Sequence, residues 1–521
     1  MSLVPAPSPE SRPWRERLAR TRGMLARLPS RPLDLTLLLA TALGLAFRLR
    51  HFLTRRALWL DEAMLALNIL HRSFGGLTQQ PMEYGQSAPI GYVFAVKLST
   101  LLFGDSEYAF RLFSLLVGCL ALLLMAYFAR RYLGGSGAAI AVALFAVGPY
   151  MVYYSAENKQ YIDDVLATLI LFSLLGRHIE GRIGRWDFLL LGGVGAILVW
   201  FSHPAAFVAA AVGATLFLHY LLRRERREIL HVSLALLAWV VSLAATYLVH
   251  LRYLAGSELL QGFWEEAFVP SPFWANLPWF WRTWVAFFEN PLGLGGIPWI
   301  ALALCLLGLV SWWRSAWQFG AATALTLALA LTANILHKYP LLGRMVLFAA
   351  PPAFLLLGIG VERLSAWIRS PRLSRGLSLA LAAYLLFFPF TNSLEEFIHP
   401  TYYEHIRPAM AYLRQHVKEG DVIYIYHYAG PAFRFYAPKY GLENSHYVIG
   451  EDHWGDLNGY RQEINALRGT KRLWVLFTHV REREGINEKE VILGYLNDAG
   501  ERKREFRSPG TSVYLYLYDL R

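Results

Sequence analysis

Long apolar runs, separated by short basic segments, occupy the chain from residue 33 to residue 392. A helix that crosses a bilayer needs about 20 mostly apolar residues. Eleven runs approach that length and are predicted to be membrane spans, at residues 33–53, 109–129, 136–154, 163–179, 187–203, 204–222, 229–250, 298–313, 316–336, 343–361 and 376–392. The pattern therefore predicts a polytopic α-helical membrane protein.

One further apolar run, Ala88 to Phe103, is short, begins with Ala-Pro and contains Gly91 and Lys97. If this run crossed the membrane, the later basic connections would lie outside. An interfacial or re-entrant helix instead leaves all of them inside, as the excess of cations in cytoplasmic loops requires. We therefore expect an interfacial helix within the first outer loop.

Arginines set the expected orientation of the chain. Seven of them precede the first span: Arg12, Arg15, Arg17, Arg20, Arg22, Arg27 and Arg31. Residues 1–32 lack the short apolar core and cleavage site of a signal peptide, so they are predicted to form a cytoplasmic basic arm. The inner connections are then the basic ones, at 130–131, 177–185, 223–227, 314 and 363–375, and the C-terminus lies outside.

After residue 394 the composition changes to that of a soluble domain. Strands are predicted at 421–426, 472–478 and 512–518, with helices at 406–417, 456–468 and 487–498. Alternating helices and strands indicate a small α/β domain. The expected domains are the arm at 1–32, a transmembrane domain at 33–394 and an extracytoplasmic α/β domain at 395–521.

Composition agrees with a membrane protein: of 521 residues, 55% are hydrophobic and 17% are charged. A net charge of +12 would suggest nucleic acid for a soluble protein. Here the arginines lie between apolar runs, so we expect membrane lipids and no nucleic acid as partners. Cys119 and Cys305 lie inside apolar runs, without the spacing of metal ligands.

Two adjacent carboxylates, Asp61 and Glu62, follow the first span in an apolar neighbourhood. A carboxylate near the bilayer is costly unless it is solvated or paired, so such a residue is a functional-site candidate. Two solvated loop acids are the alternative interpretation. Adjacent residues on a helix point about 100° apart, so both carboxylates cannot serve the same atom.

The order of motifs after this pair resembles a known family. Asp61-Glu62 is followed by Gln86-Ser87-Ala88-Pro89, then by residues 103–107, then by Arg111. This order resembles the polyprenyl-phosphate-sugar glycosyltransferases of the GT-C fold, in the branch of protein O-mannosyltransferases and lipid A aminoarabinose transferases. The similarity extends over roughly residues 33 to 400.

The resemblance implies a membrane enzyme of the cytoplasmic (inner) membrane with an outward-facing site. It would transfer one sugar from a polyprenyl phosphate to a protein, lipid or polysaccharide acceptor, with inversion at the anomeric carbon. Asp61 would be the general base and Glu62 a supporting acid. Members of this branch mostly work without a tightly bound metal, so we expect no obligatory cofactor, although a divalent cation is compatible with the chemistry.

The second outer connection, residues 153–161, contains Glu157, Lys159 and Tyr161. It resembles a family segment in which an acid is followed by a cation, commonly Arg, and then by Tyr. Lys159 keeps the charge but cannot make a bidentate phosphate contact. These three residues are candidates for substrate binding, and a polar loop without function is the alternative.

The third outer connection, residues 337–344, carries Lys338, Tyr339 and Arg344. Cations are unexpected on an outer face, and a lipid phosphate would explain them. Snorkelling to lipid head groups is the alternative. His203, which precedes a proline at an outer helix junction, and Gln86 complete the substrate-binding candidates by resemblance, with helix capping as the alternative for His203.

The long outer connection at 252–298 is rich in Trp, Phe and Pro. Aromatic residues gather at membrane interfaces without any chemical role. The alternative is an aromatic lid that packs against a sugar or a prenyl chain.

No phosphate-cradling glycine loop and no Asp-x-Asp motif of nucleotide-sugar enzymes occurs in the sequence, which agrees with a lipid-linked donor. Two other classes stay open: a transporter or flippase of lipid-linked sugars, and a glycan-binding membrane protein. A transporter would carry charges near mid-membrane and two similar halves with interrupted helices. The candidate residues lie at the outer ends of the spans, which favours the enzyme.

Overall fold

A computed structural model describes residues 31–181, 184–255, 262–296 and 298–520. The chain forms two compact units. The first, called the helical unit, comprises Met1–Leu53, Ala88–Ala95 and Leu112–Ile398. The second, called the mixed unit, comprises Thr54–Ser87, Val96–Arg111 and His399–Arg521. Most of the predicted basic arm, up to residue 30, lies outside the described residues.

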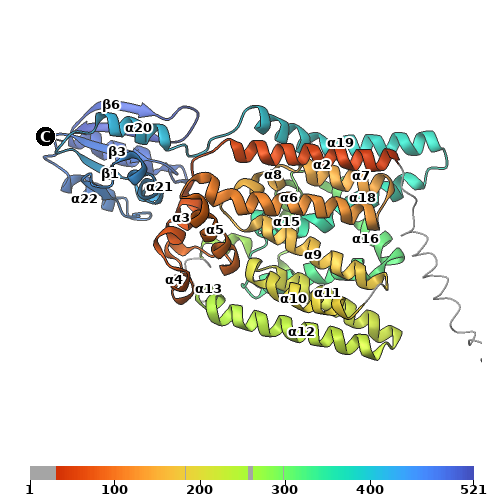
Figure 1. The fold of residues 1–521 in the computed structure, drawn as a ribbon. Coiled ribbons are helices and arrows are strands. Elements are labelled where there is room, and N and C mark those ends of the chain that lie inside the picture. Colours follow the sequence, from red (N-terminus) through yellow and green to blue (C-terminus); the bar gives the residue numbers. More distant parts are fainter. Residues whose placement is uncertain (1–30, 182–183, 256–261, 297, 521) are drawn as a thin grey trace, which may run out of the picture. The chain divides into compact units, whose positions relative to one another are not determined.

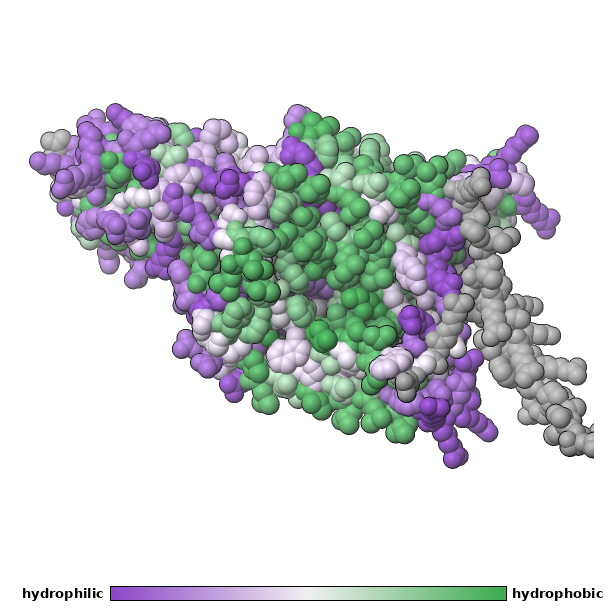
Figure 2. Space-filling view, in the orientation of Figure 1, coloured by the Kyte–Doolittle hydropathy of each residue, from purple (hydrophilic) through white to green (hydrophobic). Residues whose placement is uncertain are grey.

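Eight helices of the described chain are long and apolar enough to cross a membrane. They are α2 (Arg31–Leu53), α6 (Glu107–Tyr132), α11 (Ala205–Arg223), α12 (Arg226–Thr246) continued by the π turn η4 (Tyr247–Leu251), α16 (Pro298–Ser315), α17 (Trp317–Ile335), η7 (Gly343–Ala349) continued by α18 (Ala350–Ala366), and α19 (Pro371–Ile398). Large apolar side chains such as Leu222 and Leu379 are exposed on them, and Figure 2 shows the hydrophobic surface that the helices present. The prediction of a polytopic helical membrane protein is confirmed.

The predicted count of eleven spans is not confirmed, because three predicted spans fall on helices that are bent, short or charged. α7 (Gly135–Val147) and the short helices α8 (Pro149–Tyr153) and η3 (Tyr154–Ala156) form a pair bent by 55°. α10 (Arg185–Phe201) is short, and α9 (Tyr161–Ile179) carries two acids in its first turn. The described chain thus has eight spans, or nine if the bent pair counts as one.

Proline explains the bend after α7. α7 ends at Val147 with Gly148 as its C-cap, and Pro149 starts α8. Proline has no N–H to donate to the preceding turn and its ring clashes with that turn. The bend therefore occurs at the residue that cannot continue the helix.

Glycines allow three helices of the helical unit to pack closely. A Cβ at Gly360 of α18 would lie 2.1 Å from the Leu304 carbonyl oxygen of α16. On the other side of α18, a Cβ at Gly358 would lie 2.2 Å from the carbonyl oxygen of Gly137 in α7. Small residues at helix interfaces let backbones approach in this way. In Figure 1, α2 and α7 run alongside each other in the same bundle.

The helical unit also contains α13 (Arg252–Ala255), η5 (Glu265–Ala267), η6 (Phe273–Ala275) and α15 (Leu277–Glu289). A 14-residue apolar helix, α5 (Ile90–Phe103), forms where an interfacial helix is predicted. At 1.5 Å per residue it is about 21 Å long, too short to span a bilayer core of about 30 Å.

The mixed unit is built on a five-stranded sheet of order β2-β1-β3-β7-β6. Its strands are β1 (Val422–Ile425), β2 (Tyr447–Ile449), β3 (Leu473–Phe477), β6 (Glu501–Arg507) and β7 (Tyr514–Asp519). β1 is parallel to both β2 and β3, whereas β7 is antiparallel to β3 and β6. The predicted α/β character of the C-terminal region is confirmed.

The helices of this region are α20 (Arg407–His416), η8 (His427–Ala429), α21 (Gly430–Tyr436), η9 (Ala437–Tyr440), α22 (Asn458–Ala466) and α23 (Glu488–Ala499), and a small hairpin pairs β4 (Glu482–Arg483) with β5 (Ile486–Asn487).

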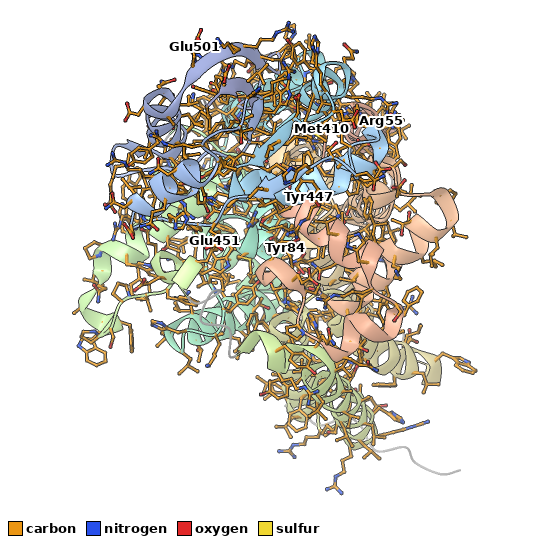
Figure 3. The ribbon with its side chains drawn as sticks, turned by 90° about the vertical axis from the view of Figure 1, so that its left-hand side faces the viewer. Arg55, Tyr84, Met410, Tyr447, Glu451 and Glu501 are labelled. Atoms are coloured by element: carbon orange, nitrogen blue, oxygen red, sulfur yellow. The ribbon has the colours of Figure 1, made fainter. Side chains whose placement is uncertain are left out.

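Residues 54–87 and 96–111 belong to the mixed unit although they are distant from it in sequence. They form α3 (Leu60–His71), α4 (Phe74–Gln79), η2 (Glu83–Gly85) and parts of α5 and α6. Tyr436 accepts a hydrogen bond from the Leu58 amide (2.9 Å) and donates one to Glu107 (3.0 Å). Arg434 donates to the Tyr84 hydroxyl (2.8 Å), in the part of the unit that Figure 3 shows with Tyr84 labelled. The loop after the first span is therefore built into the C-terminal region.

Candidate active site

The two catalytic candidates, Asp61 and Glu62, lie in the first turn of α3. Glu62 forms a buried ion pair with Arg111, with side chains 1% and 3% exposed. Arg111 Nε donates to Oε1 (2.8 Å), and Nη2 donates to Oε2. Bidentate pairing of this kind fixes both position and orientation. Because both oxygens of Glu62 accept from Arg111, Glu62 holds α3 in place.

Arg111 also fixes the chain that leads into α3. It donates to the backbone carbonyls of Arg56 (2.7 Å) and Ala57 (3.2 Å). A buried guanidinium needs acceptors for its five N–H groups, and the loop supplies two of them. The position of Asp61 is thus set by contacts on both sides of it.

Asp61 itself is half-buried, beside a polar pair from the C-terminal region. Glu404 accepts from the Leu60 amide (3.0 Å) and from His479 Nδ1 (2.6 Å). Burial lowers the pKa of His479, but the hydrogen bond and charge of Glu404, with the charge of Asp61, outweigh burial and raise it. Glu404 and His479 are not among the residues predicted from the sequence, because no short-range motif marks them.

Gln86 is buried in the same unit and lies next to a tight turn. Its amide donates to the Tyr84 carbonyl (3.4 Å). Tyr84 has a φ of 61°, in the left-handed region that non-glycine residues rarely adopt. Gln86 therefore shapes the loop after α3 in this structure.

In the helical unit, the connection between η3 and α9 is packed into the protein. The Tyr153 hydroxyl donates to Glu157 Oε1 (3.2 Å), and the Asn158 side chain accepts from Tyr92 (3.3 Å). Glu157 and Lys159 are only 1% and 6% exposed. Charged side chains are rarely buried to this extent without a structural or functional reason. Their burial therefore favours substrate binding over a polar loop without function.

The structure brings Tyr161 and Arg344 together from two of the predicted connections. The guanidinium carbon of Arg344 lies 5.4 Å from the ring centroid of Tyr161 and 5.6 Å from that of Trp264. Both distances are within the range of cation–π attraction. Tyr154 packs edge-on against Tyr161 at 5.2 Å and interacts electrostatically with Glu157 and Arg344. Acid, aromatic and cation thus share one cluster.

Asn334 ties the third connection to the aromatic-rich segment before α15. Its amide nitrogen donates to the carbonyls of Ala267 (2.8 Å) and Tyr339 (3.0 Å), and its oxygen accepts from the Val269 amide (3.0 Å). The Tyr339 hydroxyl donates to the Met345 carbonyl (2.8 Å). Three hydrogen bonds from one buried amide hold this loop, next to which Lys338 is exposed.

His203 lies between α10 and α11 and stacks on His250, with ring centroids 6.2 Å apart. Two buried acids that the sequence analysis did not select, Asp163 and Asp164, lie nearby in the first turn of α9, and Asp164 has a hydrogen bond with Ser202. The sequence does mark these two acids. Placing a carboxylate inside an apolar run costs free energy, so such residues are candidates for a functional site.

Among the described residues, no group of three or more His, Cys, Asp or Glu side chains could hold a metal ion.

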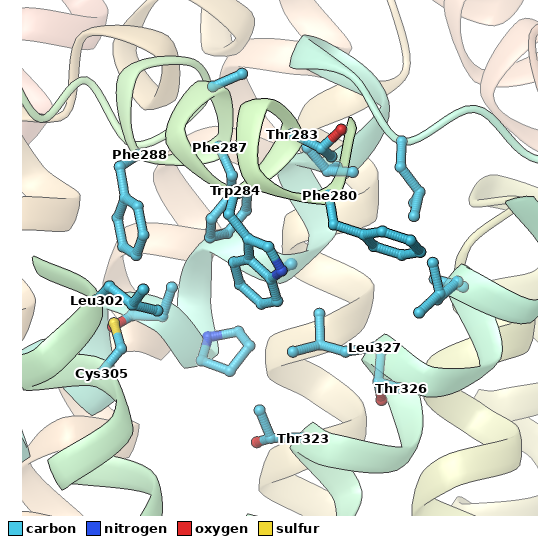
Figure 4. Close-up of a pocket in the computed structure, with 18 of the residues that line it drawn as sticks. Phe280, Thr283, Trp284, Phe287, Phe288, Leu302, Cys305, Thr323, Thr326 and Leu327 are labelled. Atoms are coloured by element: carbon cyan, nitrogen blue, oxygen red, sulfur yellow. The ribbon is translucent and has the colours of Figure 1, made fainter. Parts of the chain in front are cut away.

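An apolar pocket of about 270 Å³ opens between α15, α16, α17 and α18. Figure 4 shows Trp284 of α15 pointing into the space between Leu302 of α16 and Leu327 of α17, and Phe280 and Phe287 of α15 also line the pocket. The aromatic connection predicted from the sequence therefore contributes one wall of a hydrophobic pocket.

Comparisons with known proteins agree with the predicted resemblance. Residues 87–250 match the family model of dolichyl-phosphate-mannose-protein mannosyltransferase. A curated relative, undecaprenyl phosphate-alpha-4-amino-4-deoxy-L-arabinose arabinosyl transferase of Edwardsiella ictaluri (strain 93-146), is 26% identical over 238 residues. That match spans 42% of this chain and 40% of the relative's length.

Solved structures share the fold over most of the chain. ArnT from Cupriavidus metallidurans bound to undecaprenyl phosphate matches with a TM-score of 0.52 and 14% identity, over 92% of this chain and 97% of that one. The oligosaccharyltransferase AglB from Archaeoglobus fulgidus, in complex with an inhibitory peptide and a dolichol-phosphate, matches with a TM-score of 0.50 and 12% identity, over 94% and 74%. An Archaeoglobus fulgidus oligosaccharyltransferase complex with Zn and sulfate matches with a TM-score of 0.50 and 11% identity, over 84% and 67%. The chain thus has the fold of these membrane glycosyltransferases, and the GT-C resemblance is confirmed.

Proposed function

We propose that this chain is a membrane glycosyltransferase that transfers one sugar from a polyprenyl phosphate to an acceptor hydroxyl or amine. The observation that carries the proposal is the fold shared with ArnT over 92% of this chain and 97% of that protein. ArnT was solved with undecaprenyl phosphate, a lipid of the class proposed here as leaving group. The acceptor is a protein, a lipid or a polysaccharide.

The proposed site faces outward from the cytoplasmic membrane. The basic arm lies inside, and the bent α7–α8 pair, α9 and α10 cross with the eight longer helices, which gives eleven spans within the transmembrane domain at 33–394. The domain at 395–521 then lies outside. Basic connections on the inner side support this orientation.

Asp61 is the proposed general base. It takes the proton of the acceptor O–H or N–H as that atom attacks the anomeric carbon from the face opposite the phosphate. The new glycosidic bond forms while the bond from carbon to phosphate oxygen breaks, and the phosphate leaves with the electron pair. Glu62 contributes by holding α3 through Arg111.

Arg344, Lys338 and Lys159 are the proposed partners of the phosphate. Fixed cations aimed at charge that develops in the transition state are an effective catalytic device. Arg344 is held against Tyr161 and Trp264, so its position needs little reorganisation.

The remaining candidates have supporting roles in the proposal. Glu157 and Tyr161 position the sugar or the cations, and Tyr339, His203 and Gln86 shape the surrounding loops. The apolar pocket beneath α15 takes part of the prenyl chain, because it offers a hydrophobic surface to a hydrocarbon. The proposal assigns no step to a metal ion or to another cofactor.

Mass analysis of surface glycans in a strain that lacks this gene tests the proposal. The wild-type gene should restore a glycan that the deletion removes, whereas Asp61→Asn should not, at equal protein level in the membrane. Asp498→Asn, at an exposed position of α23, serves as the matched control and should restore it. Full restoration by Asp61→Asn would remove the catalytic role of Asp61.

A further inference from the structure

Helix α3, which carries Asp61, begins without a side-chain cap of its own. Its N-cap residue, Trp59, makes no capping hydrogen bond. The first N–H groups of a helix lack partners within the helix and need acceptors from elsewhere. Glu404 supplies one of these, because its Oε2 accepts from the Leu60 amide at 3.0 Å. A carboxylate from the C-terminal region thus caps the helix of the proposed base.

The second oxygen of Glu404 binds His479. The distance from His479 Nδ1 to Glu404 Oε1 is 2.6 Å, and the ring of His479 lies 6.3 Å from that of Trp59. Glu404 is 8% exposed and His479 is 39% exposed. The pair therefore flanks the segment Trp59–Asp61. Glu404, the buried residue, binds the backbone of this segment, and His479 is accessible to solvent.

His479 is held in an unusual backbone conformation. Its φ is 51°, in the left-handed region, which non-glycine residues rarely adopt and which occurs preferentially at functional sites. His479 also lies just after β3, at the carboxyl end of the parallel strands. Open α/β sheets place their ligand-binding groups at that edge.

Several charged or titratable groups face His479. Glu404 and Asp61 favour its protonated form, and Arg481 opposes it. His427 also interacts with His479 electrostatically, and the ring of Tyr428 lies 5.5 Å from its ring. The two acids outweigh Arg481 in their effect on the pKa of His479.

We propose that Glu404 and His479 form a positioning pair for Asp61. Glu404 fixes the start of α3, and its partner His479 places an imidazole ring beside the Asp61 carboxylate. The inference rests on the proposed function, in which Asp61 takes the acceptor proton. It assigns the C-terminal region a part in the reaction that is exerted through Asp61, beyond the residues that the family resemblance suggests.

A transfer assay with full-length purified protein tests the pair. Lipid extract from the deletion strain supplies donor and acceptor, and the readout is the initial rate of free polyprenyl phosphate release across pH. We expect His479→Gln and Glu404→Gln to lower the rate at least tenfold at an unchanged donor KM. His479→Gln should also move the acid limb of the profile to higher pH by about half a unit or more, because a nearby cation favours a charged carboxylate. His479→Arg should move that limb back toward the wild-type position.

The control is His446→Gln, at an exposed position of the same unit, which should behave as wild type. Wild-type rates and profiles for both pair variants, with Asp61→Asn inactive, would overturn the positioning role and leave the proposed function standing. A lowered rate with an unshifted acid limb in His479→Gln would also overturn it, since loss of structure alone gives that result. An active Asp61→Asn would instead overturn the proposed function itself.

Discussion

At the scale of residues, the two adjacent acids Asp61 and Glu62 have different surroundings, because Glu62 is bound on both oxygens by Arg111 and Asp61 lies beside His479. Glu62 and Arg111 are both buried and share two hydrogen bonds. Arg111 also binds the backbone of Arg56 and Ala57. The sequence predicted that the two carboxylates cannot serve the same atom, because neighbouring side chains on a helix point about 100° apart. The sequence did not predict that Glu62 pairs with Arg111, because 49 positions separate the two residues.

Breaking the Glu62–Arg111 pair should destabilise the protein strongly. Glu62→Ala or Arg111→Ala leaves a buried charge without its partner, which costs about 3–5 kcal/mol. Glu505→Ala removes the exposed Arg502–Glu505 pair and should cost no more than about 1 kcal/mol. Thermal unfolding midpoints in detergent measure the difference. Equal midpoints for Glu62→Ala and Glu505→Ala would show that the buried pair contributes nothing.

Two histidines of the C-terminal region should make stability depend on pH. Burial, with the nearby Arg407, lowers the pKa of His405 to about 4, and burial lowers that of His427 to about 4. In the unfolded chain both titrate near 6.5, so the unfolded state binds protons first as pH falls. Their contribution is complete above about pH 6.5 and is lost as pH falls toward 4.

The thermal unfolding midpoint should therefore fall between pH 6.5 and pH 4.5. In the double variant His405→Asn/His427→Asn this fall should be smaller, whereas His446→Asn, at an exposed position, should keep the wild-type slope. His479 contributes with the opposite sign. Its raised pKa gives stability below the unfolded value that is lost as pH rises through the folded value. An unchanged slope in the double variant would contradict the assignment.

At the scale of elements, periodicity and composition predicted the helices and the central strands well. β1, β3 and β7 lie where β-branched and aromatic residues predict strands. β6 escaped prediction because Glu501 to Arg507 is mostly charged and exposed, as edge strands often are. The predicted count of eleven spans is not confirmed, because Pro149 bends one helix and two acidic residues lie in the first turn of another.

Close helix packing in the helical unit should make Gly360 intolerant of any side chain. In Gly360→Ala the new Cβ would lie 2.1 Å from the Leu304 carbonyl oxygen, and overpacking costs about 1–3 kcal/mol. Gly193, in α10, has nothing within 4 Å of its added Cβ, so Gly193→Ala should be neutral or slightly stabilising. Thermal unfolding of the two alanine variants decides this, and equal midpoints would count against the tight interface.

Asn334 should hold the loop that carries the cation candidates. Asn334→Ala removes three hydrogen bonds from the backbone of that loop and of the segment before α15. Each buried group left unsatisfied costs about 1–3 kcal/mol. We expect faster cleavage near residues 337–344 in limited proteolysis and slower sugar transfer. Thr332→Ala, at an exposed position of the same helix, should change neither.

At the scale of the whole molecule, the sequence predicted the fold but not which segments make up each of its two units. The loop after the first span joins the C-terminal region through contacts such as Leu58 to Tyr436, which are 378 positions apart. No local pattern encodes a contact of that separation. Sidedness stays a prediction, which rests on the basic connections that repeat along the chain. A reporter enzyme that folds only outside the cytoplasm should be active when it is fused after residue 520. Activity of a reporter that works only inside the cytoplasm would instead show that the C-terminal region lies inside.

The most direct test of glycosyl transfer is the release of polyprenyl phosphate in detergent. Purified protein is added to the solubilised lipid extract of the deletion strain, and free polyprenyl phosphate is followed by mass spectrometry. Detergent removes sealed compartments, so a transporter produces no change. We expect the wild-type protein to release polyprenyl phosphate as the acceptor gains one sugar mass, and Asp61→Asn to release none. No release by the wild-type protein, or equal release by Asp61→Asn, would contradict it.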